Sequence, residues 1–198
     1  MTRFNSPISV PNILTVVRIL LTPLFVILSL RHMYPMALLV FAAAGLSDGL
    51  DGLIARWMNQ RTALGAYLDP LADKLLLVSA YVVLAVLGVI PAWVSVIVIT
   101  RDVIILMGIA ILTLTEKKYD IRPTLLSKCT TTAQILTVIL LLFDPSRGHL
   151  NLLYPAVLWI TATLTILSGL HYIYFGMTIL QDSDTKASDH HKGGQAEG

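Results

Sequence analysis

Charged residues and cysteine are what this sequence has least of. Lys, Arg, Asp and Glu make up only 13% of its 198 residues, about half the share of an average soluble domain. The hydrophobic share is 56% and the mean hydropathy is +0.76. This composition excludes a cytosolic enzyme, a disordered protein and a nucleic-acid binder that relies on a basic patch. The single cysteine, Cys129, excludes an internal disulfide and a zinc site built from several thiols.

Long apolar stretches take the place of polar surface. Because a membrane helix needs about 20 apolar residues, the length suits one domain with about six spans. The membrane domain is predicted to occupy residues 1–180, and the polar residues 181–198 are predicted to form a disordered tail. The sequence thus predicts an all-α integral membrane protein with six transmembrane helices, at residues 13–30, 35–55, 66–87, 91–114, 125–143 and 152–180.

Lysine and arginine are distributed unequally between the predicted loops. With six spans both termini lie on one side, and that side collects nine Lys and Arg residues, whereas the other side holds only Arg31 and Arg147. Because short loops rich in Lys and Arg stay in the cytoplasm, we predict cytoplasmic termini and a multi-pass protein of the cell (inner) membrane. We expect no cleavable signal peptide, because the first apolar stretch lacks a small-residue cleavage site and is long enough to span.

Five aspartates interrupt the predicted spans or lie at their ends. A carboxylate costs about 2.5–3.5 kcal/mol at the bilayer centre and less near the interface, so its presence indicates a function by default. The alternative is a set of structural ion pairs with Arg18, Arg56, Lys74 or Arg101. The five residues are Asp48, Asp51, Asp69, Asp73 and Asp102.

Four of these aspartates form two pairs at helical spacing. Asp48 and Asp51 are three residues apart, and Asp69 and Asp73 are four apart, so each pair shares one helix face. The loop between the two spans is short, and both pairs are therefore expected to converge at the cytoplasmic surface. Four ionised carboxylates need cations, and hard oxygen ligands suit Mg²⁺ or Mn²⁺. Two such ions form a clamp for displacement at phosphorus.

Small residues accompany the first pair of aspartates. Gly45 and Gly49 fit ordinary packing of helices through small residues. Gly52 and Ala55 lie beside the carboxylates, where the absence of bulk lets backbone approach a ligand closely. Arg56 and Thr62 follow at the cytoplasmic side and are candidates for phosphate contacts.

The residues in this region resemble the signature of the CDP-alcohol phosphotransferase family. Eight fixed positions within 26 residues match that signature, which makes the signal highly specific. The segment from Pro11 to Arg18 is similar to the family segment that opens the first span and contacts the nucleotide lipid. The matching residues are Asp48-x2-Asp51-Gly52-x2-Ala55-Arg56-x8-Gly65-x3-Asp69-x3-Asp73.

The resemblance implies transfer of the phosphatidyl group of CDP-diacylglycerol to an alcohol, with release of CMP, at the cytoplasmic face of the membrane. Two divalent cations, Mg²⁺ or Mn²⁺, would be held by Asp48, Asp51, Asp69 and Asp73. Asp73 would also be the general base on the acceptor hydroxyl, and the enzyme would be a homodimer among membrane lipids. CDP-diacylglycerol would be bound by Asn12, Thr15, Gly52, Ala55, Arg56, Thr62 and Gly65.

Three cations at cytoplasmic ends of spans are candidates for binding an acceptor phosphate: Arg101, Arg122 and Lys128. Arg122 is equally a positive-inside anchor, and Arg101 is alternatively a structural partner of Asp102. The stretch from Lys128 to Gln134 is similar to the Lys-x-x-Thr-x-x-Gln pattern of family members with glycerol-type acceptors.

Two glycerol-type acceptors remain open. The resemblance places sn-glycerol 3-phosphate slightly ahead of phosphatidylglycerol, because transfer to glycerol 3-phosphate is the commoner role of short chains of this type, although two sequence features point the other way. The first would make phosphatidylglycerophosphate, the second cardiolipin. The usual phosphatidylglycerophosphate synthase has a second arginine where this sequence has Ile109, and Arg122-Pro123-Thr124 is closer to the cardiolipin synthase group. An ion-coupled transporter is a distant alternative, because the acids cluster at one membrane face and no internal repeat is visible.

Overall fold

The computed structural model describes residues 10–58, 63–114, 125–145 and 153–193, with side chains described within 16–47, 74–108, 125–145 and 153–174. The described chain forms six α-helices and contains no strand, which confirms the predicted all-α class. Five of the predicted segments begin and end within three residues of a helix. The helices are α1 (Val10–Leu30), α2 (Tyr34–Met58), α3 (Ala63–Val86), α4 (Ala92–Leu114), α5 (Leu125–Phe143) and α6 (Leu153–Gly193).

Two tight turns end α1 and α3 in the same way. His32 and Gly88 adopt positive φ angles of 57° and 69°. In each turn this residue donates its N–H to the carbonyl three residues earlier, and the next residue donates to the carbonyl five residues before itself, at 2.9–3.0 Å. This is the Schellman arrangement, which satisfies the last carbonyls of a helix. These two turns lie where the sequence predicts the breaks after the first and the third span.

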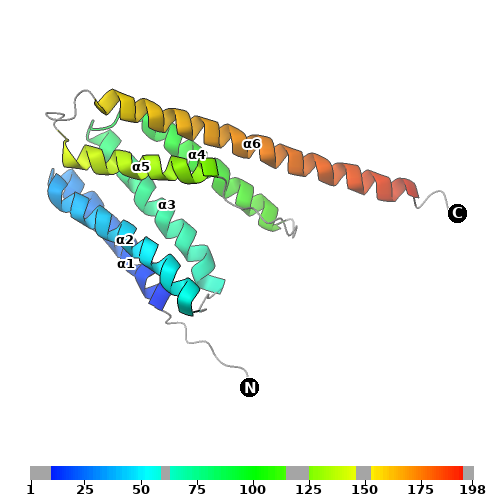
Figure 1. The fold of residues 1–198 in the computed structure, drawn as a ribbon, viewed down its shortest axis with the longest axis horizontal. Coiled ribbons are helices and arrows are strands. Elements are labelled where there is room, and N and C mark those ends of the chain that lie inside the picture. Colours follow the sequence, from blue (N-terminus) through cyan, green and yellow to red (C-terminus); the bar gives the residue numbers. More distant parts are fainter. Residues whose placement is uncertain (1–9, 59–62, 115–124, 146–152, 194–198) are drawn as a thin grey trace, which may run out of the picture.

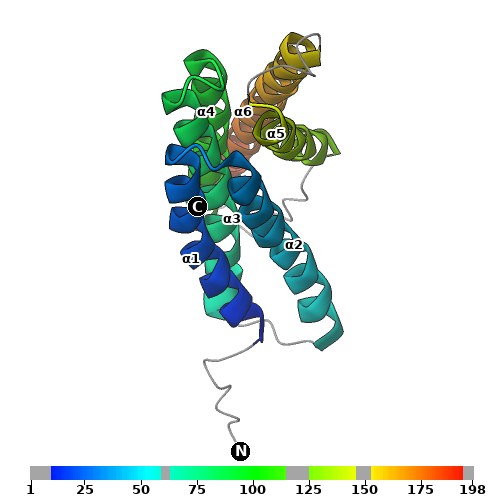
Figure 2. The same cartoon turned by 90° about the vertical axis from the view of Figure 1, so that its left-hand side faces the viewer.

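The helices form two groups that meet along α2, α3, α4 and α5. In the first group α1 packs along both α2 and α3, and in the second group α6 packs along both α4 and α5. Contacts of α2 with α5 and of α3 with α4 join the groups. Figure 1 shows the start of α1, the end of α2 and the start of α3 at one end of the bundle, near the N-terminus, and Figure 2 shows the same arrangement from the side.

An apolar core lies between the helices of the first group and extends to α4 and α5. Phe25 of α1 and Phe41 of α2 are buried and their ring centroids are 5.6 Å apart. Leu84 and Val94 continue this core into α3 and α4. Ala37 of α2 belongs to the same buried cluster and adds little bulk to it.

Two of the described helical segments are long and apolar enough to cross a membrane by length and composition. They are Leu125–Phe143 and Leu153–Tyr174, and three shorter apolar segments also lie within the described residues. Trp93 and Trp159, near the starts of α4 and α6, are exposed with ring centroids 5.3 Å apart, as expected for aromatic side chains at a membrane interface. The six-span topology and the cytoplasmic termini stay predictions.

The end of α6 differs from the predicted boundary. The helix does not stop near Leu180 but continues to Gly193. Between these two positions the sequence contains neither glycine nor proline, the two residues that most strongly end a helix. The side chains beyond Tyr174 and residues 194–198 lie outside the described part of the chain, so the prediction of a disordered tail is untested.

Candidate active site

The four signature aspartates lie on two helices whose ends are adjacent. Asp48 and Asp51 are in α2, and Asp69 and Asp73 are in α3. Helical backbone at spacings of three and four places the members of each pair on one face. Their side chains lie outside the described residues, and the metal and catalytic roles remain predictions. Figure 1 shows the end of α2 and the start of α3 at the same end of the bundle.

The residues predicted to bind the nucleotide lipid fall on the same three helix ends. Asn12 and Thr15 are in the first turns of α1, and Gly65 is in the first turn of α3. The signature residues Gly52, Ala55 and Arg56 are in the last turns of α2. These side chains are outside the described ones, and Thr62 and Arg122 lie outside the described residues altogether. The backbone thus places these three helix ends together, and the individual contacts to the nucleotide lipid stay predictions.

The first described side chain beyond the signature is Lys74, which directly follows Asp73. Lys74 Nζ donates a hydrogen bond to Asp102 Oδ1 at 2.7 Å, and this ion pair joins α3 to α4. The Asp102 residue is 1% exposed, whereas the Lys74 side chain is 18% exposed. Asp102 is therefore a structural ion-pair partner, which is the alternative that the sequence left open for this fifth aspartate.

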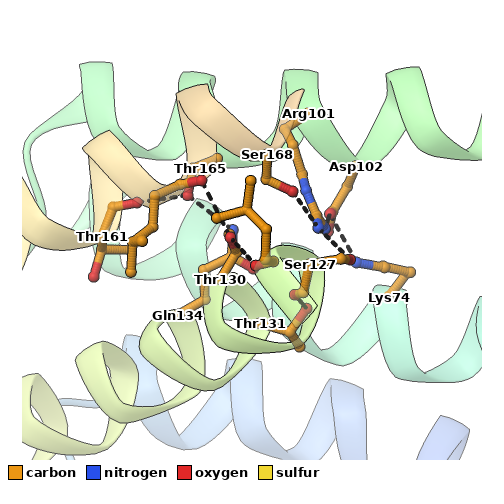
Figure 3. A network of polar contacts seen from close by, with 12 residues as sticks. Lys74, Arg101, Asp102, Ser127, Thr130, Thr131, Gln134, Thr161, Thr165 and Ser168 are labelled. Carbon is orange, nitrogen blue, oxygen red and sulfur yellow. Dashed lines mark hydrogen bonds and ion pairs between the residues drawn. The ribbon is translucent and has the colours of Figure 1, made fainter. Parts of the chain in front are cut away.

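Arg101 completes a buried polar cluster between four helices. Its Nη1 donates to Asp102 Oδ1 at 2.8 Å, and its Nη2 donates to Ser127 Oγ of α5 at 2.8 Å and to Ser168 Oγ of α6 at 3.0 Å. The guanidinium carbon also lies 6.0 Å from the ring centroid of Tyr172. Arg101 is 3% exposed. Figure 3 shows the cluster, which we call the ion brace: Lys74, Arg101, Asp102, Ser127 and Ser168.

The ion brace contains one more positive than negative charge. Asp102 Oδ1 accepts from both cations, while Asp102 Oδ2 and Arg101 Nε have no hydrogen-bond partner in the described structure. Lys74 is the more exposed of the two cations. The more exposed cation is therefore the residue that directly follows Asp73 in the chain.

The third described cation region is the start of α5. Lys128 is exposed and follows Ser127 of the ion brace. The other two residues of the Lys-x-x-Thr-x-x-Gln pattern are Thr131, which is half-buried and donates its Oγ1 to the carbonyl of Ser127 at 3.2 Å, and Gln134, which is buried. Thr130, inside the same stretch, is also buried. Thr130 Oγ1 donates to the carbonyl of Leu164, and Gln134 Nε2 donates to Thr165 Oγ1, so the side chains of Thr130 and Gln134 both face α6. Lys128 is the cation of this stretch, and the structure leaves its side chain exposed.

Sequence reasoning missed the roles of Ser127, Ser168 and Tyr172. Arg101 and Ser168 are 67 residues apart in the chain, and nothing in the local pattern of α6 distinguishes Ser168 from other small polar residues. The contact of Lys74 with Asp102 could have been predicted from the sequence, because opposite charges within consecutive apolar helices are expected to pair.

The profile of the family described as CDP-alcohol phosphatidyltransferase matches residues 8–167. The chain belongs to this family. The match extends from just before α1 into α6 and includes every signature aspartate and four of the five residues of the ion brace, since it ends one residue before Ser168. Membership confirms the resemblance that was read from the spacing of eight residues.

Relatives within the family carry two kinds of name. A Homo sapiens protein named cardiolipin synthase (CMP-forming) is 37% identical over 195 residues, covering 90% of this chain and 65% of that protein. A Mycobacterium tuberculosis (strain CDC 1551 / Oshkosh) protein named probable phosphatidylglycerophosphate synthase is 32% identical over 169 residues, covering 82% of this chain and 78% of that protein. A Mycobacterium bovis protein named putative cardiolipin synthase is 40% identical over 104 residues, 51% of this chain and 49% of that protein.

Proposed function

We propose that the protein is a membrane-bound phosphatidyltransferase of phospholipid biosynthesis, which transfers the phosphatidyl group of CDP-diacylglycerol to a glycerol-type acceptor and releases CMP. The observation that carries the proposal is the family signature on α2 and α3, whose ends are adjacent in the bundle. The site would open at the cytoplasmic face of the cell membrane, and two copies of the chain would form a homodimer.

The donor set of the site suits two divalent cations. Four aspartates provide only oxygen ligands, and they form two helical pairs, at a spacing of three in α2 and of four in α3. Mg²⁺ or Mn²⁺ prefers such ligands together with phosphate oxygens. When bound, the ions supply charge neutralisation of the pyrophosphate and of the leaving CMP.

Asp73 is the residue we assign to proton transfer, because it matches the signature position of the family's general base. A hydroxyl is a poor nucleophile, and a carboxylate within hydrogen-bond reach takes its proton as the bond to phosphorus develops. We expect Asp73→Asn to lower kcat strongly while CDP-diacylglycerol still binds. Near-normal turnover of this variant would show that another group takes the proton.

For the acceptor we place phosphatidylglycerol first and glycerol 3-phosphate second, the reverse of the slight preference drawn from sequence. The described pairing of Arg101 with Asp102 supports this order, because of the two candidate cations that the structure describes it leaves Lys128 as the accessible one. A phosphodiester carries one negative charge, where glycerol 3-phosphate carries nearly two. Ile109 and the higher identity with the human cardiolipin synthase point the same way. The mycobacterial phosphatidylglycerophosphate synthase relative keeps the second acceptor in view.

An acceptor panel tests the proposal directly. Purified protein would be given CDP-diacylglycerol and Mg²⁺ with phosphatidylglycerol, glycerol 3-phosphate, inositol or serine, and both CMP and the lipid product would be measured. Cardiolipin from phosphatidylglycerol alone is the expected result. Phosphatidylglycerophosphate from glycerol 3-phosphate alone would reverse the order of acceptors, and no CMP with any acceptor would return the ion-coupled transporter to consideration.

Lys128→Ala sharpens the acceptor assignment. A charge-assisted hydrogen bond contributes about 1.5–3 kcal/mol, so loss of a phosphate contact is expected to raise the acceptor KM at least several-fold. An unchanged acceptor KM would remove Lys128 from the acceptor site while leaving the reaction class intact.

A further inference from the structure

We propose that Asp102 is a positioning residue that sets the distance between the catalytic carboxylate and the acceptor-binding cation. This inference rests on the proposed function, because it takes the roles of Asp73 and Lys128 from there. The structural basis is that the ion brace holds the chain neighbour of each: Lys74 follows Asp73, and Ser127 precedes Lys128.

The first step of the argument is connectivity. Asp102 Oδ1 accepts from Lys74 at 2.7 Å and from Arg101 at 2.8 Å, and Arg101 reaches Ser127 at 2.8 Å. These three bonds form a continuous path from α3 through α4 to α5 (Figure 3). The path bridges two helices that otherwise share few contacts in the described structure. A direct hydrogen bond from the Tyr81 hydroxyl to the carbonyl of Gln134 at 3.2 Å also joins α3 to α5, farther along both helices. The brace therefore fixes the rotation and height of α3 relative to α5 at the level of Lys74 and Ser127.

The second step is the burial of the path. Asp102 and Arg101 are almost completely buried, and Arg101 also donates to Ser168 and lies near the Tyr172 ring. Water therefore does not compete for these bonds, and in a low-dielectric setting bonds to ionised groups strengthen. Charge neutralisation alone would need only the Arg101–Asp102 pair, since these neighbours already balance each other. Lys74 is therefore not needed for charge balance. Its bond to Asp102 joins α3 to the pair.

The third step separates the two ends of the path. Lys74→Met releases α3 from Asp102 but leaves Arg101 paired, so the misplaced group is Asp73 and the expected loss is in kcat. Ser127→Ala releases α5 but leaves α3 tied, so the misplaced group is Lys128 and the expected change is in the acceptor KM. A misplacement of about 1 Å can lower the rate about 100-fold. Each substitution removes one bond of the brace and leaves the others, so we expect a smaller displacement and a change of about 10-fold in the parameter concerned.

The experiment measures kcat and acceptor KM for both variants, with purified protein, CDP-diacylglycerol and Mg²⁺. We expect kcat to fall about 10-fold in Lys74→Met with acceptor KM within about twofold, and the reverse in Ser127→Ala. Lys74→Arg, which keeps the charge and a donor, is expected to recover most of kcat. Asp102→Asn should change both kcat and the acceptor KM. If Asp102→Asn fails to fold, Lys74→Met and Ser127→Ala still test the proposal.

The matched control is Thr161→Val, which removes a buried 2.7 Å hydrogen bond between Thr161 of α6 and Thr137 of α5 without touching the brace. Both kinetic parameters are expected to stay within about twofold of the unchanged protein. If Lys74→Met and Ser127→Ala match this control, or if both lower kcat and raise KM together, the positioning role is wrong. No CMP release by the unchanged protein would instead overturn the proposed function, and this inference with it.

Discussion

The two groups of helices are held together by different forces. Among the described side chains, the contacts of α1, α2 and α3 are mainly apolar, with Phe25 against Phe41 and small alanines between them. The contacts between α4, α5 and α6 are mainly polar. They use hydroxyl, amide and ionised groups at Arg101, Asp102, Thr130, Gln134, Thr137, Thr161, Thr165 and Ser168.

This difference is informative because lipid offers apolar side chains the same surroundings as a protein core. Helices in a membrane therefore associate through close van der Waals packing and through hydrogen bonds between them. The first group uses the former route, and its fit depends on shape. The second group uses the latter, and its fit depends on a few directional bonds. The proposed active site lies where the first group provides carboxylates and the second group provides cations.

The largest expected effect is the loss of a signature carboxylate from the first group. Asp69→Asn removes one ligand from a centre whose charge must be balanced, and electrostatic stabilisation of several kcal/mol corresponds to about 1000-fold or more in rate. CMP release should become undetectable while the melting temperature stays close to that of the unchanged protein. Separate titration of Mg²⁺ should show an absolute requirement in the unchanged protein.

Excess chelator is the control for this prediction, and Asp102→Asn is the matched aspartate variant. Chelator should abolish activity reversibly, with recovery on adding Mg²⁺ or Mn²⁺. Full activity in chelator would remove the two-metal assignment. A drop in stability of Asp69→Asn as large as that of Asp102→Asn would indicate that Asp69, like Asp102, is a structural ion-pair partner.

The second prediction tests the apolar group. Phe41→Ala opens a cavity between α1 and α2, and truncation of a buried phenylalanine costs about 3–5 kcal/mol of unfolding free energy. Unfolding in detergent mixtures measures this change. Leu39→Ala in the same helix is the control, because Leu39 is 67% exposed and its truncation should cost much less. Equal costs for both variants would mean that this group is not held by packing.

Much of the fold was predictable from sequence, for reasons visible in particular residues. Apolar runs predicted five of the six helices to within three residues. The turn after α3 has Gly88 at the position with positive φ, which glycine accepts without strain in a Schellman turn. The helical spacing of Asp48 with Asp51 and of Asp69 with Asp73 was readable because spacing within one helix is a local property.

The ion brace was not predictable, because it depends on which helices become neighbours. Arg101 beside Asp102 was recognised as a possible pair, but the bonds to Ser127 and Ser168 join residues that are 26 and 67 positions away. Serine residues are common in membrane helices, and their partners follow from helix rotation rather than from sequence pattern. The continuation of α6 past Leu180 was also missed, because polar composition indicated a tail where the absence of glycine and proline permits a helix.

The third prediction tests the polar group with a smaller expected effect. Gln134 Nε2 donates to Thr165 Oγ1 at 3.2 Å, while Gln134 Oε1 has no hydrogen-bond partner in the described structure. Hydrogen bonds between membrane helices contribute about 0.6 kcal/mol on average and at most about 2. Gln134→Leu should therefore lower the unfolding free energy by less than about 2 kcal/mol.

A double-mutant cycle isolates this bond from side effects of the substitutions. Gln134→Leu, Thr165→Val and the double variant should give a coupling energy of about 0.6 kcal/mol. If this coupling energy exceeded the coupling energy of Phe25 with Phe41, a single hydrogen bond would stabilise its group more than the aromatic contact stabilises the first group. A coupling of zero would assign the α5–α6 contact to packing alone.

The smallest expected effect concerns the turns that end α1 and α3, which share one geometry but differ in residue type. His32 holds φ at 57°, a conformation that costs a side-chain-bearing residue about 1–2 kcal/mol, whereas a glycine costs about 0.4–1 kcal/mol through the unfolded chain. His32→Gly should therefore raise the unfolding free energy by about 0.5 kcal/mol. This figure includes the small loss from removing the exposed hydrogen bond between His32 and Tyr34. Gly88→Ala should lower it by about 1 kcal/mol, and because a Cβ at Gly88 would meet nothing within 4 Å, that cost is backbone strain alone. Opposite signs from two turns with the same hydrogen bonds would show that φ, and not the neighbouring helix group, sets their energy, while equal signs would show the reverse.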